Sequence, residues 1–155
     1  MALPRPASIH DIGPMWALRT RAVRAGCASH YAPEVIAAWC AAPPPDRLPD
    51  LLRAGGGLVA EEEGAMAGYG VVDLESGEVD ALFVEPAWQG RGIASTLMAA
   101  LEALAAGRGI DRLFLSASLN AVPFYRRAGF VALREERYPH RSGVTLPSVF
   151  MEKRR

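Results

Sequence analysis

The sequence is poor in the residues that staple small secreted domains or hold metals. Its 155 residues include two cysteines, Cys27 and Cys40, and three histidines that lie far apart in the chain. Two cysteines cannot form a disulfide framework, and neither residue type has the spacing of a metal site. We therefore expect reduced cysteines, no bound metal and a cytoplasmic protein.

The chain also lacks an excess of either charge and any long apolar run. Its 17 basic and 17 acidic residues cancel, and Lys153 is the single lysine. Nucleic-acid-binding domains usually carry a basic excess, so no nucleic-acid partner is expected. No apolar run approaches the ~18–20 residues that cross a bilayer, and the first residues lack the basic-then-apolar order of a secretory signal. We expect neither a membrane partner nor export.

The length fits one domain, to which we assign residues 1–155. In the first half, prolines and apolar periodicity predict an edge strand, two helices and one further helical turn after a proline-rich loop. These elements cover residues 3–9, 11–25, 33–40 and 51–53, and Asp11 is the expected N-cap of the first helix.

The second half begins with three short β runs separated by Glu-Gly and Ser-Gly turns, which is typical of an antiparallel meander. A helix, a strand, a short helix and a hairpin follow. The predicted ranges are 58–62, 66–74, 79–84, 93–107, 113–117, 120–128, 130–138 and 144–151. The crossover helix makes strands 79–84 and 113–117 parallel. The predicted fold is α+β, with a mixed, mostly antiparallel sheet of about seven strands.

A glycine-rich turn opens the long helix. Small residues at Gly90, Gly92 and Ala94 allow backbone amides to surround a ligand, and the helix start adds partial positive charge. Such a turn suits a phosphate or pyrophosphate, although glycines can also serve turn geometry alone. The sequence lacks the Gly-Lys-Ser/Thr of a phosphate-binding P-loop, and a dinucleotide motif would need another glycine at position 95.

Two motifs carry a family resemblance. Gln89-Gly90-Arg91-Gly92-Ile93-Ala94 resembles the acyl-CoA pyrophosphate motif of the GNAT superfamily of N-acetyltransferases, Gln/Arg-x-x-Gly-x-Gly/Ala. Ser118-x-Asn120-Ala121-x-x-Phe124-Tyr125, followed by Gly129-Phe130, resembles the second cofactor motif of the same superfamily. The segment His30-Tyr31-x-Pro33-Glu34 is similar to a subgroup of bacterial acetyltransferases.

The resemblance implies acetyl-CoA as co-substrate, bound between two splayed parallel strands, with helices on both faces of the sheet. The pyrophosphate would contact the amides of the glycine-rich turn, and the pantetheine arm would pair with the strand before it. The implied cofactor-binding residues are Leu82, Phe83, Val84, Gln89, Gly90, Arg91, Gly92, Ile93, Ala94, Ser95, Asn120, Phe124 and Tyr125.

Acetyl transfer also needs an acid for the departing thiolate and a base for the acceptor amine. Tyr125 is the candidate general acid for the departing thiolate, and its alternative is an ordinary core tyrosine. Asp80 and Glu78 share strand parity and are candidate bases for the acceptor amine, directly or through water. His30 and Tyr31 are expected to line the acceptor side or to form only a connecting loop. Asn120 also stands where a helix N-cap belongs.

These expectations describe an acetyl-CoA-dependent N-acetyltransferase that acts on a primary amine by direct attack in a ternary complex. The acceptor is a small molecule or a peptide, and the sequence does not identify it. The sequence also does not decide whether acyl groups other than acetyl are used. The carboxy-terminal hairpin offers an edge for a homodimer. The alternative function is a non-catalytic acyl-CoA-binding sensor or interaction module, and Tyr125 favours the enzyme.

Overall fold

The computed structural model describes residues 3–140 and 142–155, so Arg141 of the predicted last turn lies outside the described residues. The elements in chain order are β1 (Arg5–Pro6), η1 (Ile9–Asp11), α1 (Ile12–Gly26), α2 (Pro33–Ala41), α3 (Leu48–Arg53), β2 (Gly57–Glu62), β3 (Ala65–Val72), β4 (Val79–Val84), η2 (Pro86–Trp88), α4 (Ile93–Gly107), β5 (Arg112–Ser118), η3 (Leu119–Ala121), α5 (Val122–Arg127), β6 (Val131–Pro139) and β7 (Thr145–Arg154).

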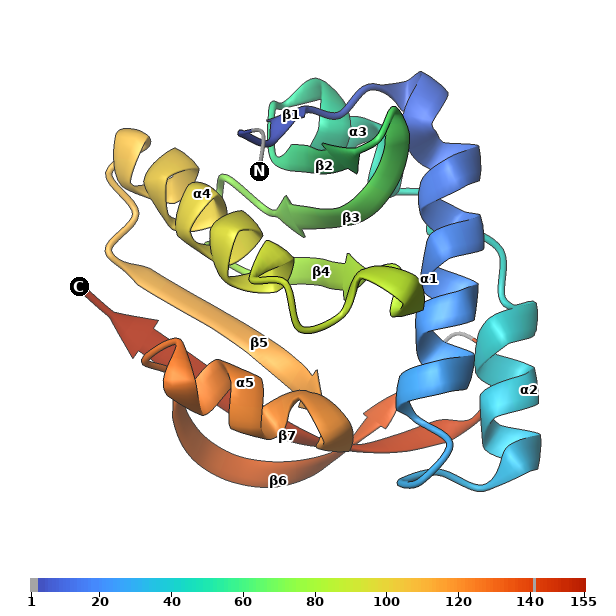
Figure 1. Ribbon diagram of the computed structural model, residues 1–155. Helices are drawn as coiled ribbons and strands as arrows, with labels where there is room; N and C mark the ends of the chain where they lie inside the picture. The colour runs from blue at the N-terminus through green and yellow to red at the C-terminus, as the bar shows by residue number, and fades with distance from the viewer. Residues whose placement is uncertain (1–2, 141) are drawn as a thin grey trace.

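The strands form two sheets that meet at one point. Strands β1-β2-β3-β4 make an antiparallel four-stranded sheet, and β5-β7-β6 make an antiparallel three-stranded sheet. Within the described residues, the bridge recorded between the sheets is the parallel pair Glu78–Phe114. From there β4 and β5 diverge (Figure 1). The predicted α+β class and parallel pair are confirmed, and the predicted single sheet is divided in two because β4 and β5 separate.

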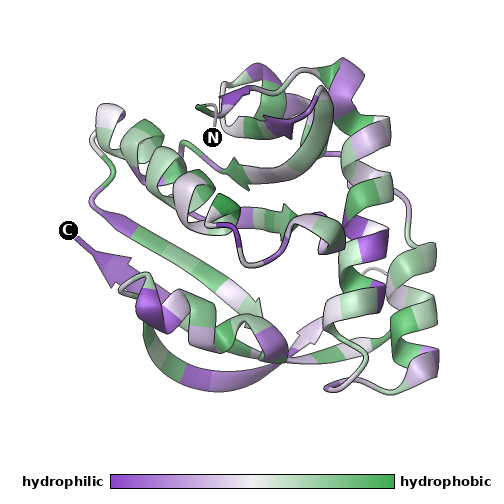
Figure 2. Ribbon diagram, in the orientation of Figure 1, coloured by the Kyte–Doolittle hydropathy of each residue, from purple (hydrophilic) through white to green (hydrophobic). Residues whose placement is uncertain are grey.

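Helix α4 covers one face of the four-stranded sheet through a very close approach to β3. A Cβ added at Gly68 would lie 3.1 Å from the Ile93 side chain, and one at Gly70 would lie 2.8 Å from that of Leu101. The helix buries its apolar stripe there, and Figure 2 shows hydrophobic colouring along α4 and on the strands beside it. This packing fixes the start of α4 against the end of β4.

Helices α1 and α3 cover the opposite face of the same sheet. Met15 and Leu18 of α1 are fully buried against Val59 and Tyr69, and Leu52 of α3 joins this cluster. A third cluster packs the end of α1 and α2 against the β6–β7 hairpin. Helices therefore lie on both faces, as predicted, and the two amino-terminal helices border the opening between the sheets (Figure 1).

Some predicted boundaries were wrong. Helix α3 begins at Leu48, not at residue 51, because Pro49 occupies the first helical turn, where proline costs no hydrogen bond. The predicted helix 120–128 is split into η3 and α5. Asp11 precedes α1 but makes no cap hydrogen bond there. Its carboxylate instead accepts from the backbone of Ser8 and from Arg5.

Candidate active site

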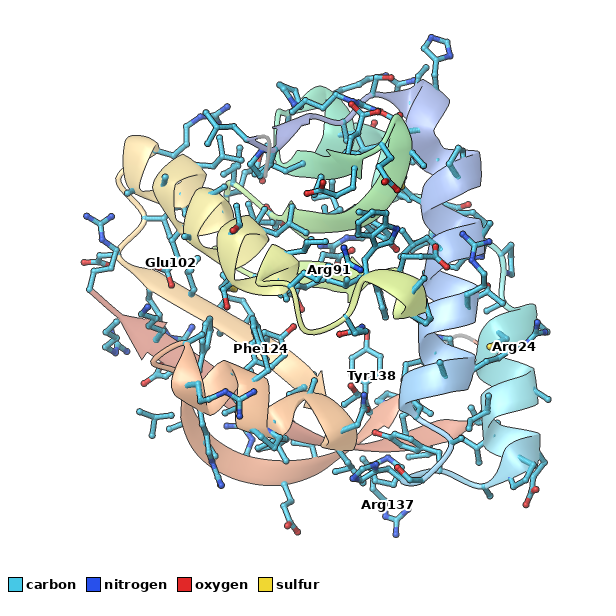
Figure 3. The ribbon with its side chains drawn as sticks, in the orientation of Figure 1. Arg24, Arg91, Glu102, Phe124, Arg137 and Tyr138 are labelled. Atoms are coloured by element: carbon cyan, nitrogen blue, oxygen red, sulfur yellow. The ribbon has the colours of Figure 1, made fainter. Side chains whose placement is uncertain are left out.

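A cleft of about 340 Å³ lies where β4 and β5 diverge. Both strands, α1, α2, α5 and the β6–β7 hairpin contribute to its walls. Figure 3 shows Tyr138 pointing from the end of β6 into this opening. The residues that line it include Trp16, Arg19, Tyr31, Trp39, Glu78, Asp80, Leu82, Phe83, Ser116, Ser118, Tyr125, Tyr138, His140, Leu146 and Ser148.

One wall of the cleft carries carboxylates at the start of β4. The register between β3 and β4 shifts there. Val79 and Ala81 pair with neighbouring residues of β3, and Asp80 between them is an extra residue. Such a bulge re-aims side chains next to a ligand site. The Arg47 guanidinium lies 3.0 Å from the Asp80 carboxylate and 3.6 Å from those of Glu78 and Asp73. Burial, and then the charge of Asp80, raise the pKa of Glu78 above its ordinary value.

A buried cation forms the floor between α1 and α2. The Arg19 side chain is 2% exposed, and its guanidinium donates to the carbonyls of Trp39 and Cys40 and to the Thr20 hydroxyl. It also lies 4.1 Å from the ring centroid of Trp16. These contacts tie α1 to α2 and hold the aromatic side chains that line this part of the cleft.

The turn between β4 and α4 has the geometry expected of an anion-binding loop. Gly90 and Gly92 adopt left-handed φ angles of 77° and 79°, and no Cβ at either position would meet an atom within 4 Å. Gly92 is the N-cap of α4 and supplies no side-chain cap, so the first N–H groups of the helix stay available. The Gln89 amide donates to the Val84 carbonyl at 3.2 Å, which fixes the turn.

Tyr125 enters the cleft from α5. Its side chain is 8% exposed and packs edge-on against Phe124 and Phe130, with ring centroids 5.2 Å and 5.6 Å away. Burial raises the pKa of its hydroxyl well above the ordinary value. The hydroxyl therefore stays protonated at any working pH.

Comparison with known proteins agrees with this arrangement. The family model of the acetyltransferase (GNAT) domain matches residues 27–152. The chain belongs to the GNAT acetyltransferase family. Its relatives include the uncharacterized N-acetyltransferase YafP of Escherichia coli K12, which is 30% identical over 127 residues, 82% of this chain and 79% of YafP.

Solved structures give the same assignment of the fold. A GCN5-related N-acetyltransferase of Rhodopseudomonas palustris superposes with a TM-score of 0.87 at 30% identity, over 100% of this chain and 98% of that one. The PaiA N-acetyltransferase of Thermoplasma acidophilum, solved with coenzyme A, gives a TM-score of 0.75 at 19% identity over 100% of both chains. At that lower identity the second likeness concerns the fold alone.

The cleft of this GNAT acetyltransferase brings together only part of the predicted site. It is lined by the candidate catalytic residues Tyr125, Asp80 and Glu78, and by Leu82 and Phe83. Outside its walls lie Val84, Gln89, Gly90, Arg91, Gly92, Ile93, Ala94, Ser95, Asn120, Phe124 and His30. Most of these form the turn and first helical residues next to the cleft. The Arg91 guanidinium lies 4.6 Å from the ring centroid of Trp88.

The two acceptor-side candidates behave differently. Tyr31 lines the cleft, and its hydroxyl donates to the Pro147 carbonyl at 2.6 Å and accepts from the Leu119 amide at 3.1 Å. It thus connects the α1–α2 turn to β7 and η3. His30 is exposed and contacts Ser29. Asn120 makes no cap hydrogen bond; its side-chain oxygen accepts from the Cys27 thiol at 3.3 Å.

Sequence reasoning missed the two arginines of the cleft region and the aromatic side chains of Trp16, Trp39 and Tyr138. Arg47 follows a proline-rich loop and Arg19 sits in an Arg-rich helix, so neither carries a local signal for a role in the cleft. No group of three or more His, Cys, Asp or Glu among the described residues is arranged to hold a metal. No helix in the described ranges is long and apolar enough to span a membrane.

Proposed function

We propose that this GNAT acetyltransferase transfers an acetyl group from acetyl-CoA to a primary amine by direct attack in a ternary complex. The observation that carries the proposal is the divergence of β4 and β5, which opens one cleft lined by Tyr125 on one side and by Glu78 and Asp80 on another. Donor and acceptor can meet in that cleft. PaiA, which shares this fold, was solved with coenzyme A.

The donor binds along the free edge of β4 and against the turn that follows. In antiparallel pairing alternate residues turn their backbone groups away from the partner strand. Because Glu85 donates to Ala67 of β3, the groups at the free edge belong to Leu82 and Val84, on either side of Phe83, and these can hydrogen-bond the amides of the pantetheine arm, as strand edges bind peptides. The pyrophosphate meets the amides of Gln89–Ser95, where the partial positive charge of α4 favours an anion. The open space at Gly90 and Gly92 supports this placement.

The acceptor ammonium must lose a proton before it attacks. Asp80 or Glu78 accepts it, directly or through water. The raised pKa of Glu78 makes that carboxylate a stronger base than an exposed one. Glu85 lies outside the walls of the cleft and is bound by Arg21 through hydrogen bonds of 2.7 Å and 2.8 Å, so it is not placed to accept this proton.

Tyr125 stabilises the departing thiolate. At reference pKa values of about 10 and 8.5, complete proton transfer from tyrosine to the thiolate runs uphill by roughly 2 kcal/mol, and burial of the hydroxyl increases this cost. The hydroxyl therefore acts mainly by donating a hydrogen bond to sulfur as negative charge develops. The thiol takes its final proton from solvent or from the acceptor.

Neither cysteine is suited to form a covalent acetyl-enzyme intermediate. Burial raises the pKa of Cys27 to about 11, and its thiol donates to Asn120. A thiol with so high a pKa is a poor nucleophile at neutral pH. Cys27 and Cys40 both lie outside the walls of the cleft, so direct attack is the simpler route.

Thiol release from acetyl-CoA in the presence of a panel of primary amines tests the proposal. Direct attack predicts intersecting initial-velocity lines, whereas an acetyl-enzyme predicts parallel lines. Tyr125→Phe should retain acetyl-CoA affinity and lose at least about tenfold in turnover, within the usual range for such groups. The loss should shrink with a thioester of a more acidic thiol. Tight acetyl-CoA binding without turnover on any amine would favour the sensor function.

A further inference from the structure

Arg47 contacts three carboxylates around the start of β4. Its guanidinium lies 3.0 Å from the Asp80 carboxylate and 3.6 Å from those of Glu78 and Asp73. Glu78 and Asp80 line the cleft, whereas Asp73 and Arg47 lie outside its walls. Arg47 is therefore placed to act on the two candidate bases without itself facing the acceptor.

The chain around Arg47 anchors its backbone. Residues 43–45 are all proline, and three consecutive prolines leave the backbone little freedom. Leu48, directly after Arg47, is 4% exposed and packs in the cluster that joins α1 and α3 to the four-stranded sheet. The Arg47 carbonyl also accepts a hydrogen bond of 3.1 Å from the Leu51 amide in α3. The guanidinium thus extends from a fixed point toward the carboxylates.

Asp73 belongs to the turn between β3 and β4. One of its carboxylate oxygens accepts from the backbone amides of Glu75 and Ser76, at 2.9 Å and 3.4 Å. Its own backbone amide donates to the Glu78 carbonyl at 2.8 Å. The turn therefore sets Asp73 beside Glu78, and three negative charges share the positive charge of one guanidinium.

Neighbouring carboxylates oppose each other's ionisation, and Arg47 counteracts this effect. Burial, and then the charge of Asp80, raise the pKa of Glu78. The charge of Arg47 and its hydrogen bond act in the opposite direction, and the charge of Asp73 adds to the rise. The guanidinium is thus the group that holds this cluster in its ionised form.

Other titratable side chains face the same cleft. Those that line it, among the described residues and besides Glu78 and Asp80, are Arg19, Tyr31, Tyr69, Tyr125, Tyr138 and His140. Arginine and tyrosine ordinarily keep their charge state between acidic and neutral pH. Burial raises the pKa of Tyr69 further, and the charge of Asp80 contributes to that rise. A test of Arg47 must therefore separate the carboxylates from the imidazole of His140.

We propose that Arg47 is a positioning residue for proton transfer, which keeps Glu78 and Asp80 ionised side by side so that either can accept a proton from the acceptor ammonium. The proposal rests on the acetyl-transfer function above. The proton moves from the ammonium nitrogen to a carboxylate oxygen, and the guanidinium exchanges none. Without their shared cation, the carboxylates should retain a proton to a higher pH, so acetyl transfer should begin at a higher pH.

The pH dependence of kcat tests this role, with both substrates saturating and an amine that the wild type acetylates. In Arg47→Gln the acid limb should move to higher pH by roughly 0.5–1 unit, which lowers turnover on that limb by about threefold to tenfold. Turnover above the limb should match wild type. Arg47→Lys keeps the charge and should lie closer to wild type. Arg53→Gln is the matched control, because Arg53 pairs with Asp50 at 3.4 Å outside the cleft, and its profile should be unchanged.

NMR titration of the side-chain carboxyl carbons identifies the groups that move. The midpoints of Glu78 and Asp80 should rise in Arg47→Gln and stay in Arg53→Gln, and a shift confined to His140 would overturn the inference. A fall in Tm of Arg47→Gln with an unmoved acid limb would also overturn it, since the ion pairs would then be structural alone.

Two kinetic outcomes have a different meaning. Turnover that rises in Arg47→Gln at every pH, with a lower KM for the amine, would show that the guanidinium competes with the acceptor, and would refute the positioning role. A wild-type protein that binds acetyl-CoA but acetylates no amine would overturn the acetyl-transfer function and this role together. An active wild type whose acid limb does not respond to Arg47→Gln overturns the role alone.

Discussion

Substituting Gly92 by valine tests the assignment of the glycine-rich turn to the pyrophosphate. The structure divides the expected effect into two parts. Gly92 has a φ of 79°, so a side chain there strains the backbone by about 1–2 kcal/mol. A Cβ would meet no protein atom within 4 Å, so the free protein suffers no clash. The added branched side chain instead occupies the space assigned to the ligand.

Gly109→Val provides the matched control. Gly109 has a φ of 75° and equally open surroundings, but it follows the other end of α4, away from the cleft. Both variants should therefore lose about 1–2 kcal/mol in the free energy of unfolding, or roughly 2–8 °C in Tm for a domain of this size. Circular dichroism and urea titration measure this shared cost.

Calorimetry with acetyl-CoA measures the part that should differ. Gly92→Val should weaken binding by at least about tenfold, equivalent to 1.4 kcal/mol, while Gly109→Val should bind like wild type. If the two variants lose the same stability and both keep wild-type affinity, the pyrophosphate does not approach Gly92 and the placement is refuted.

Three further predictions concern the walls of the cleft. Asp80→Asn should lower turnover, most of all at low pH, and leave acetyl-CoA affinity intact; a pH–rate profile of unchanged shape and height would remove Asp80 from proton transfer. Because the pKa of Glu78 is raised in the folded protein, its ionisation destabilises the fold as pH rises through that pKa, so Glu78→Gln should gain in Tm relative to wild type between acidic and neutral pH. A constant difference across the range would contradict this. Tyr31→Phe loses two hydrogen bonds and leaves the Leu119 amide unpaired, so urea unfolding should report a loss of about 1–3 kcal/mol, and an unchanged midpoint would show that the bridge to β7 is dispensable.

The sequence predicts those parts of the fold that depend on local pattern. The apolar stripe of α4 and the hairpin turns of the meander are short-range signals, and the crossover rule makes β4 and β5 parallel. The start of α3 was missed because the prolines before Leu51 read as a loop, although Pro49 fits a first helical turn. The division into two sheets depends on how strands diverge in space, which no local pattern records.

In the candidate site, too, residues in local sequence motifs were predicted and residues brought together only by the fold were not. Motif positions such as Gly92 and Tyr125 are visible because their neighbours in sequence are also their neighbours in the site. Arg47 reaches Asp80 across 33 positions of chain, and Arg19 is buried by α2.

The one bridge recorded between the two sheets in the described residues has a consequence for backbone exchange with solvent. Beyond Glu78 and Phe114, no strand of residues 3–140 or 142–155 lies beside the β4 amides that point away from β3, so deuterium should enter there far faster than on the side paired with β3. A pantetheine arm bound as proposed would supply the missing partner. Ligand would then slow exchange along alternate residues of one strand, giving an every-second-residue footprint that outlines the edge on which the donor lies.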